Sequence, residues 1–327
     1  MNLSEKKDPS LLLLVLAFAA VYIIWGSTYI AIVYVLETLP PFLMAGARFL
    51  IAGSLLYCWA RLRGAQKPTL AHWGRALLIG AMLFLLGNGS VVWAEQHVPS
   101  GVVALLITTE PIWIVLLEWF LDNNRPNRGV VTGLVLGFIG TVVLIGPSAF
   151  SGLANSDLLS CLIVLGSSFF WAAGSLYLAR AVLPSSPLLM TGMQMLAGGL
   201  LLTLMGTSFG EWSHINFDAI SQRSIFGWLY LTIFGSLIAF TAYSWLARVA
   251  PPSRVATYAY VNPGIAVLLG WVLKNEPVTQ RTLFAALLLV SAVILITSNR
   301  QTVKKAGALK DSITDKVVDK NAVCLAE

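Results

Sequence analysis

Charged residues are scarce in this sequence. Asp, Glu, Lys and Arg make up only 11% of the 327 residues, whereas 57% are hydrophobic. Charged residues fill about a quarter of a typical soluble domain, so this composition excludes an ordinary soluble protein and indicates a membrane protein with several spans. The net charge of +6 does not by itself indicate a nucleic acid as partner, because basic residues also gather where spans meet the cytoplasm.

Cysteine and histidine are also rare, with three residues each: Cys58, Cys161, Cys324, His72, His97 and His214. No Cys-x-x-Cys spacing occurs, so neither a metal site nor a disulfide framework is supported, and we expect no metal and no cofactor. The histidines fall in or beside separate predicted loops, which argues against a catalytic centre. The phosphate-binding pattern Gly-x-x-x-x-Gly-Lys-Ser/Thr is missing too, which excludes a self-contained ATP-driven pump.

Long apolar stretches fill most of the chain. A helix needs about 20 apolar residues to cross a membrane, and ten stretches approach or exceed this length: 11–34, 42–60, 75–94, 101–120, 130–147, 158–179, 187–207, 225–247, 254–273 and 281–298. The first follows Lys6 and Lys7 and is too long for a cleaved signal peptide, so we read it as a retained span. The connection 208–224 is predicted to be a hydrated surface loop, and 300–327 a disordered cytoplasmic tail.

The basic residues are distributed unevenly between the two sides of the predicted membrane. If the N-terminus is cytoplasmic, the inside segments hold 17 of the 21 Lys and Arg residues and the outside segments hold three, while Arg48 lies within a span. Cytoplasmic segments carry the excess of Lys and Arg in membrane proteins. The sequence therefore predicts a multi-pass protein of a bacterial inner membrane with both termini in the cytoplasm.

The two halves of the sequence repeat each other. Residues 41–56 align with 187–202 with eight identities in sixteen positions, and residues 93–119 align with 245–271 at a constant offset of 152. We therefore predict two homologous units, 11–147 and 158–298, of five spans each. Because five is odd, the second unit enters the membrane in the opposite direction. The predicted fold class is an all-α integral membrane protein with ten transmembrane helices in two inverted five-helix repeats, which alternating-access transporters use.

An acid stands directly before a proline in the fourth predicted span. A charge at this depth is costly, so Glu110 is a candidate functional residue. Pro111 removes a backbone donor and is predicted to kink the helix. The repeat brings the same arrangement back as Asn262 and Pro263 in the ninth span. Polar residues at two related kinks favour a symmetric membrane transporter.

Arg48 interrupts the second span at nearly the same depth as Glu110. Arg48 lies six residues and Glu110 nine residues from the predicted outer end of its span, and a helix rises about 1.5 Å per residue. One interpretation is a buried ion pair that satisfies both charges. In the functional interpretation Glu110 carries a coupling proton or binds an amine, and Arg48 tunes its proton affinity or binds a carboxylate. A pair that breaks when the substrate binds would do both.

Aromatic residues fall in the middle of the first and sixth spans rather than at their ends. Trp25 and Tyr29 lie one helical turn apart and share a face, and their counterparts in the second repeat are Trp171 and Tyr177. Buried indole N–H groups need a hydrogen-bond partner. These residues fit either the wall of a cavity for an apolar or aromatic substrate or simple packing.

Further polar and aromatic candidates lie in the third, eighth and ninth spans. Asn88, between two glycines, offers a donor and an acceptor at mid-depth, and the glycines allow close helix approach or local unwinding of the kind that lines transport cavities. Tyr243, Tyr258 and Asn262 are candidates for the opposite wall, whereas Tyr260 points roughly away from Tyr258 and Asn262.

Two other features have simpler interpretations. Glu95 and Glu118 lie near the ends of their spans and are expected to be solvated anchors. The glycines at positions 129, 133 and 137 form a stripe of small residues in the fifth span. Such a stripe permits close helix packing, which we expect within the monomer, with a dimer face as the alternative.

Several local motifs, taken in order, resemble one known family. They are Tyr-Ile-Ile-Trp-Gly-Ser-Thr-Tyr at 22–29, Ala-Arg-Phe at 47–49, Gly-Asn-Gly at 87–89, Val-Pro-Ser-Gly at 98–101 and Tyr-Ala-Tyr-Val-Asn-Pro at 258–263. Their order and spacing resemble the EamA-type branch of the drug/metabolite transporter superfamily, across all ten spans. The resemblance implies a bacterial inner-membrane exporter of amino acids or other small metabolites. The acid at Glu110 departs from it, because that position is usually apolar or small in this branch.

The sequence thus favours a secondary active transporter that exports amino acids or other small metabolites by alternating access, with proton coupling left open. Its expected partners are a small-molecule substrate, the lipid bilayer and, if coupled, protons, but no nucleic acid, and it is expected to be a monomer or weak homodimer. A facilitative exchanger is the main alternative. A channel, or a membrane-embedded enzyme acting on lipid-like substrates, is less well supported, because the chain has no pore-loop signature and no catalytic cluster; we expect no enzyme.

Overall fold

The computed structural model describes residues 10–98, 100–123, 125–145, 157–274 and 279–298, and every regular element in these ranges is a helix. The first half contains α1 (Leu11–Leu36), α2 (Pro41–Leu62), α3 (Leu70–Gly80), η1 (Ala81–Gly89), α4 (Ser90–Ala94), α5 (Ser100–Ile107), α6 (Glu110–Asp122) and α7 (Arg128–Ile145). The second half contains α8 (Asp157–Arg180), α9 (Pro187–Ser208), η3 (Glu211–His214), η4 (Phe217–Ala219), α10 (Gln222–Tyr230), η5 (Leu231–Phe240), α11 (Thr241–Val249), α12 (Pro252–Val255), α13 (Tyr258–Lys274) and a last helix over Gln280–Ser298.

The helices match the predicted membrane spans closely. Eight helical segments in the described ranges are long and apolar enough to cross a membrane, and α7 is a shorter apolar helix at the place of the fifth span. At the ninth span, residues 252–274 form two helices, α12 and α13, with a break after Val255. The predicted helical membrane fold is therefore confirmed. The predicted tail, 300–327, lies outside the described residues.

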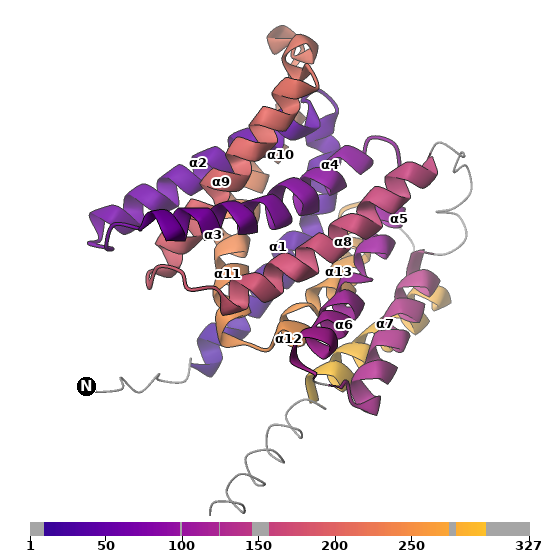
Figure 1. Cartoon of the computed structure of the whole chain (residues 1–327). Helices are drawn as coiled ribbons and strands as arrows, with labels where there is room; N and C mark the ends of the chain where they lie inside the picture. Colours follow the sequence, from indigo (N-terminus) through magenta and orange to yellow (C-terminus); the bar gives the residue numbers. More distant parts are fainter. Residues whose placement is uncertain (1–9, 99, 124, 146–156, 275–278, 299–327) are drawn as a thin grey trace, which may run out of the picture.

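The inverted repeat is visible where α2 crosses α9 (Figure 1). A Cβ atom added to Gly46 would lie 3.1 Å from the carbonyl oxygen of Gly199, and one added to Gly53 would lie 2.9 Å from that of Gly192. The contact moves forward along α2 as it moves backward along α9, so the two helices are antiparallel. They are the second helices of the two repeats, and counterpart helices that run in opposite directions are what an inverted repeat requires.

The two repeats interleave rather than forming separate lobes. The first helix of the first repeat, α1, packs against α10, η5, α11 and α13 of the second, and α8 packs against η1, α4, α5 and α6 of the first. Glycines allow both approaches: a Cβ on Gly26 would lie 2.7 Å from the side chain of Ile265, and one on Gly174 would lie 2.8 Å from that of Leu83. Any cavity between the repeats is therefore lined by both.

Each repeat contains a π-helical stretch in its third helix. η1 continues α3 over Ala81–Gly89, and η5 continues α10 over Leu231–Phe240. Of the two roles predicted for the glycines around Asn88, close helix approach is confirmed, because a Cβ on Gly87 would lie 2.7 Å from the side chain of Trp171 and one on Gly89 would lie 2.7 Å from that of Leu202. The backbone does not unwind there but stays helical and widens. π-helical turns are rare and occur mostly at functional sites. η1 packs against α8 and α9 of the second repeat, and η5 packs against α1 and α2 of the first, so both stretches lie at the interface of the two units.

The two prolines that were expected to kink their helices behave differently. α5 ends at Ile107 and α6 begins at Glu110, so Pro111 lies in the first turn of a new helix, where its missing N–H is not needed. The threonine hydroxyls of the intervening turn donate to carbonyl groups of α5. Pro263, in contrast, lies inside α13. The predicted kink at Pro111 is thus replaced by a two-residue turn, Thr108 and Thr109, that separates two helices of the same span.

The connection between α9 and α10 does more than cover the surface. α9 has its own cap, the hydroxyl of Ser186, which accepts from the N–H of Leu189. α2 has no such cap, and the carboxylate of Glu211 accepts from the N–H groups of Phe42 at 3.1 Å and Leu43 at 2.8 Å instead. Glu211 is buried, so the predicted hydrated loop contributes a buried cap that stabilises the positive end of α2.

The glycine stripe of the fifth span packs within the chain. Positions for a Cβ on Gly133 and Gly137 lie 2.7 Å from the side chains of Ile296 and Tyr260. This confirms the expectation of packing inside the monomer for these two residues. Glu118 is buried at 6% exposure, so the prediction of a solvated anchor was wrong for it.

The crossing of α2 and α9 can be tested by a matched pair of glycine substitutions. Gly53→Ala places a Cβ 2.8 Å from the backbone nitrogen of Leu196, and we expect it to lower the free energy of unfolding by about 1–3 kcal/mol. Gly74→Ala, in α3, meets nothing within 4 Å and should be neutral or stabilising by up to about 1 kcal/mol. Thermal unfolding in detergent gives both values. Equal melting temperatures for the two variants would contradict the close crossing.

Candidate functional site

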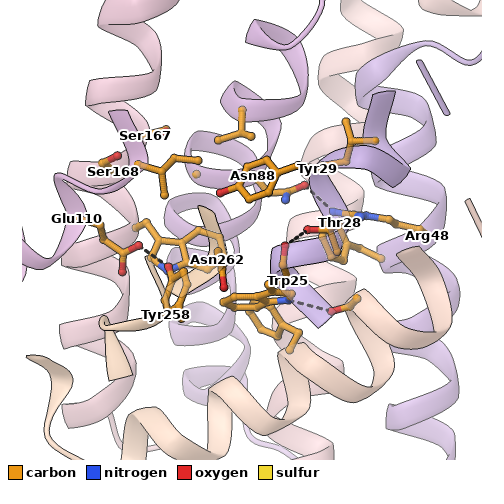
Figure 2. A pocket seen from close by; sticks show the side chains of 18 residues that line it. Trp25, Thr28, Tyr29, Arg48, Asn88, Glu110, Ser167, Ser168, Tyr258 and Asn262 are labelled. Atoms are coloured by element: carbon orange, nitrogen blue, oxygen red, sulfur yellow. Dashed lines mark hydrogen bonds between the residues drawn. The ribbon is translucent and has the colours of Figure 1, made fainter. Parts of the chain in front are cut away.

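A cavity of about 100 Å³ lies between the two repeats, enough for several waters or a small molecule. Residues from both repeats line it (Figure 2): Trp25, Thr28, Tyr29, Ile32, Arg48, Phe49, Gly87, Asn88, Val91, Ile107, Glu110, Ser167, Ser168, Trp171, Gly235, Phe240, Tyr258 and Asn262. Within the stretch from α1 to α4, the lining residues come from the second half of α1, the first half of α2, the last part of η1 and the start of α4; the others come from α5, α6, α8, η5 and α13. The cavity therefore lies mainly in the half of the bundle farther from residue 10.

Arg48 lies on one side of this cavity. Its side chain is almost completely buried, at 4% exposure. Nη2 donates to Oδ1 of Asn88 at 2.8 Å, the guanidinium lies 4.3 Å from the ring centre of Phe49, and Nε is buried without a hydrogen-bond partner. Asn88 thus positions Arg48 from the π-helical stretch η1.

Glu110 lies on the opposite side of the cavity in Figure 2. It is buried at 2% exposure, Oε2 accepts a hydrogen bond from the hydroxyl of Tyr258, and Oε1 is buried without a partner. An ion pair between Glu110 and Arg48, one of the two interpretations of these residues, is not formed in this conformation. The ion pair within 4 Å in the described part of the chain joins Arg180 and Asp122 instead. The cavity separates the two charges, and each is held by a neutral side chain instead.

Neutral amides occupy the counterpart positions in the second repeat. The repeat alignment places Gln194 opposite Arg48 and Asn262 opposite Glu110. Gln194 is fully buried and is not among the residues that line the cavity. Asn262, with its amide nitrogen directed at them, donates to the carbonyl oxygens of Tyr258 and Tyr22, both at 3.1 Å. The charges of the cavity thus come from the first repeat alone, which makes the site electrically asymmetric.

A layer of aromatic rings closes the cavity at its deeper end. The ring of Trp25 lies 5.0 Å from those of Tyr243 and Tyr258 and 5.7 Å from that of Trp171, centre to centre. Trp25 Nε1 donates to the carbonyl oxygen of Gly235 at 3.3 Å, and Trp171 Nε1 donates to the hydroxyl of Tyr243 at 3.0 Å. Both indoles therefore have the partners that buried indoles need.

Tyr243 lies behind this layer rather than on the cavity surface. It is 1% exposed, it is hydrogen-bonded to Ser175, and it lines a second, much smaller void of about 10 Å³ together with Ala247 and Val255. That void lies nearer the end of the bundle that carries the start of α1. The aromatic layer of Trp25, Trp171, Tyr243 and Tyr258 thus separates the main cavity from the other end of the molecule.

Two tyrosines of the second repeat lie away from the cavity. Tyr177 was predicted to face it but packs against the main hydrophobic core and is not a lining residue. It follows Trp171 by six residues, whereas Tyr29 follows Trp25 by four, so Tyr177 lies on another face of its helix than Trp171. Tyr260 is fully buried against α7, where its hydroxyl lies 3.4 Å from the carbonyl oxygen of Leu134. Its orientation away from Tyr258 agrees with the prediction from helical periodicity.

Small polar residues of the cavity were not predicted. Thr28, Ser167 and Ser168 line it, and each hydroxyl donates to a carbonyl group, with Ser168 reaching Leu106 of α5 at 3.3 Å. The available signal was weak: Thr28 lies one residue before Tyr29, and the two serines follow Gly166 in the same helix as Trp171. Hydroxyl groups occupied within their own helix look like ordinary helix residues in a sequence.

Glu95 is a second buried acid near the cavity. Both of its carboxylate oxygens are buried without a hydrogen-bond partner, so the prediction of a solvated anchor was wrong. It lies in the turn directly after α4, close enough to Arg48 for their charges to interact, although not within ion-pair distance. The site therefore contains one cation and two acids that do not pair directly.

The fold and the site together define a helical membrane protein built from two inverted repeats around a central cavity that is lined by aromatic rings and a few polar and charged side chains. The chain belongs to the EamA-like transporter family, whose model matches residues 12–146 and again residues 158–298. It is 38% identical to the uncharacterized inner membrane transporter YedA of Escherichia coli (strain K12) over 286 residues, which cover 86% of this chain and 89% of the relative. The protein is therefore a membrane transporter and not an enzyme.

Other relatives and one solved structure agree with this assignment. The uncharacterized transporter YvbV of Bacillus subtilis (strain 168) is 26% identical, over 89% of this chain and 94% of the relative. The protein PecM of Dickeya dadantii (strain 3937) is also 26% identical, over 84% of this chain and 88% of the relative. A solved crystal structure with 21% identity superposes with a TM-score of 0.72 over 89% of this chain and 98% of its own, which shows the same fold.

The extent of the cavity can be tested by cysteine labelling. In a variant whose native cysteines are replaced by serine, Thr28→Cys should react with a small water-soluble methanethiosulfonate at least about tenfold faster than Ala31→Cys, because thiol reactivity follows exposure. Both positions lie on α1, but Thr28 lines the cavity and Ala31 is buried in the core. The two rates are measured by mass spectrometry. Similar rates would show that water does not reach the cavity.

Proposed function

We propose that the protein is a secondary active transporter that exports amino acids or other small metabolites by alternating access. The observation that supports this most directly is the main cavity: it lies at the interface of two inverted repeats, it is lined by both, and an aromatic layer closes it at one end. Transporters of this architecture hold their substrate near the midplane at the repeat interface and move the repeats around it.

The described conformation fits one end state of that cycle. With both termini in the cytoplasm, as the distribution of Lys and Arg predicts, the half of the bundle that holds the main cavity is the outer half. The aromatic layer is then the cytoplasmic seal, and the small void beside Tyr243 lies on the path to the cytoplasm. Opening this seal while the outer half closes would expose the same residues to the other side.

Substrate contacts in this proposal come from the residues that line the cavity. The aromatic surfaces of Trp25, Tyr29 and Trp171 hold apolar parts of the substrate. Asn88 and Asn262 offer polar groups from the two repeats, and Tyr258 and Glu110 complete the wall. Tyr243 supports the layer from behind through Trp171. Tyr177 has no role in the proposed site, because it does not line the cavity.

Glu110 is the residue we propose for proton coupling. Burying an ionised carboxylate without a counter-ion costs several kcal/mol. Glu110 is buried, and its carboxylate accepts one hydrogen bond, from the hydroxyl of Tyr258. A carboxyl group in such a place can take up a proton from the side that is open and release it to the other side after the conformational change. Tyr258 belongs to the aromatic layer, so the protonation of Glu110 acts directly on the seal.

Replacement of the acid tests the coupling. Glu110→Gln keeps the size of the side chain but cannot carry a proton, and we expect it to abolish substrate-dependent proton flux in proteoliposomes while the protein stays folded. The exposed acid Glu37 provides the control, because Glu37→Gln should leave the flux unchanged. Solute exchange without proton movement, equal in wild type and Glu110→Gln, would instead identify a facilitative exchanger.

The partner of the acid is tested by a matched pair of tyrosine variants. Tyr258→Phe removes the hydroxyl that donates to Glu110, and the loss of a hydrogen bond of about 1.5–3 kcal/mol to a charged group should lower transport at least about tenfold. Tyr260→Phe removes an equally buried hydroxyl on the same helix that faces away from the cavity. Transport rates of the two variants are compared at equal protein amounts. Equal losses would contradict a specific role of Tyr258.

A further inference from the structure

Arg48 is a buried cationic side chain on the cavity wall that makes no ion-pair contact with any carboxylate among the described residues. Its side chain is 4% exposed, and no carboxylate lies within 4 Å of it in the described part of the chain. Asn88 accepts one hydrogen bond from Nη2, whereas Nε has no partner. A buried guanidinium without a paired charge is costly in a protein interior. The arrangement therefore leaves a place for an anion supplied from outside the protein.

The neighbouring acid does not fill this place. Glu95 interacts with the charge of Arg48 through space but is not within ion-pair distance. It is also not among the residues that line the cavity. Glu110 lines it, but on the opposite side and in a hydrogen bond with Tyr258 (Figure 2). The charge of the Arg48 guanidinium is thus partly offset by Glu95 through space, while N–H groups of Arg48 remain available to bind an anion.

The chemistry of the guanidinium indicates which class of anion would bind to Arg48. Arginine presents planar donors in a fixed fork that matches the two oxygens of a carboxylate, and such bidentate contacts are among the strongest hydrogen bonds in proteins. The hydrogen bond to Asn88 and the ring of Phe49 fix the plane of the group. At the opposite wall, Oε1 of Glu110 is a buried acceptor without a partner. A protonated amine would satisfy it.

We propose that Arg48, positioned by Asn88, binds the carboxylate of the transported substrate, and that Glu110 faces its amino end. This rests on the proposed transport function and narrows its substrate class to zwitterions of the amino-acid type. Quaternary amines and neutral aromatic compounds lack the group that Arg48 requires. Glutamine is the residue at the counterpart position of the second repeat, Gln194 on α9, so Arg48→Gln is the test variant, and its folding is checked separately.

The first test measures the charge preference of the cavity and does not depend on transport. In the variant without native cysteines, Thr28→Cys is labelled with two methanethiosulfonates of similar size, one carrying a sulfonate and the other a trimethylammonium group. The ratio of their rates is normalised to Ser213→Cys in the exposed connection after α9. We expect the anionic reagent to be preferred and Arg48→Gln to lower the ratio about tenfold. A ratio that Arg48→Gln leaves unchanged would overturn the proposal.

The second test uses a matched series of ligands: phenylalanine, phenylalaninamide, 3-phenylpropionate and phenethylamine. Protection of Thr28→Cys from labelling reports their occupancy of the cavity. Phenylalanine should protect at concentrations about ten- to a hundredfold lower than its amide, as expected for a charge-assisted hydrogen bond. Arg48→Gln should remove this difference, and Arg48→Lys should retain part of it. Equal protection by acid and amide would exclude a carboxylate site even if transport of another compound is found.

Separate control measurements distinguish misfolding of a variant from loss of the carboxylate site. Gel filtration of Arg48→Gln and Arg48→Lys in detergent shows whether each variant remains monodisperse. If Glu110→Gln keeps its proton flux but Arg48→Gln still loses the preference for the acid over the amide, the coupling proposal fails and the carboxylate site stands. If the labelling ratio and the ligand preference are both unaffected by Arg48→Gln, the carboxylate site fails whatever the coupling.

Discussion

The cost of charge inside a membrane is the constraint on which this structure depends. Arg48 and Glu110 are both almost completely buried, yet they do not pair with each other. Such residues in membrane proteins face the bundle interior or a water-filled cavity, or find partners. Here both line the cavity and each has a hydrogen-bond partner. Arg48 and Glu110 lie on opposite sides of the cavity between the repeats, where Asn88 and Tyr258, which also line it, hydrogen-bond to them. An ion pair would be more stable in isolation but would fill the space that a substrate needs.

The interleaved repeats explain how one layer of side chains can control access. Trp25 comes from the first helix of one repeat and Trp171 from the first helix of the other, and each packs into the opposite repeat. Their rings meet Tyr243 and Tyr258 in a layer that also contains the partner of Glu110. A movement of one repeat against the other must therefore rearrange this layer. The π-helical stretches η1 and η5 lie next to it, at related positions of both repeats.

Most of the fold could be predicted from the sequence, because the apolar stretches and the internal repeat are strong signals. The helix break at Pro111, the π-helical stretches and the cap on α2 by Glu211 could not, since each depends on contacts between distant segments. In the site, Trp25, Asn88 and Glu110 were recognisable as polar or bulky residues in unexpected places. Of the two interpretations of Arg48 and Glu110, the ion pair is not formed in this conformation, because equal depth does not imply contact. Tyr177 does not line the cavity because it follows Trp171 by six residues, whereas Tyr29 follows Trp25 by four. Thr28 and the two serines gave no signal that distinguishes them from ordinary helix residues.

The central claim is that one cavity is reached from each side in turn, and counterflow tests it most directly. Proteoliposomes are loaded with a high concentration of an unlabelled amino acid and diluted into a trace of the labelled compound, without a proton gradient. The account predicts that the label accumulates transiently above its equilibrium level, because each loaded carrier must return with a substrate bound. Downhill flux of the same compound without any such overshoot would contradict alternating access and indicate a continuous pathway instead.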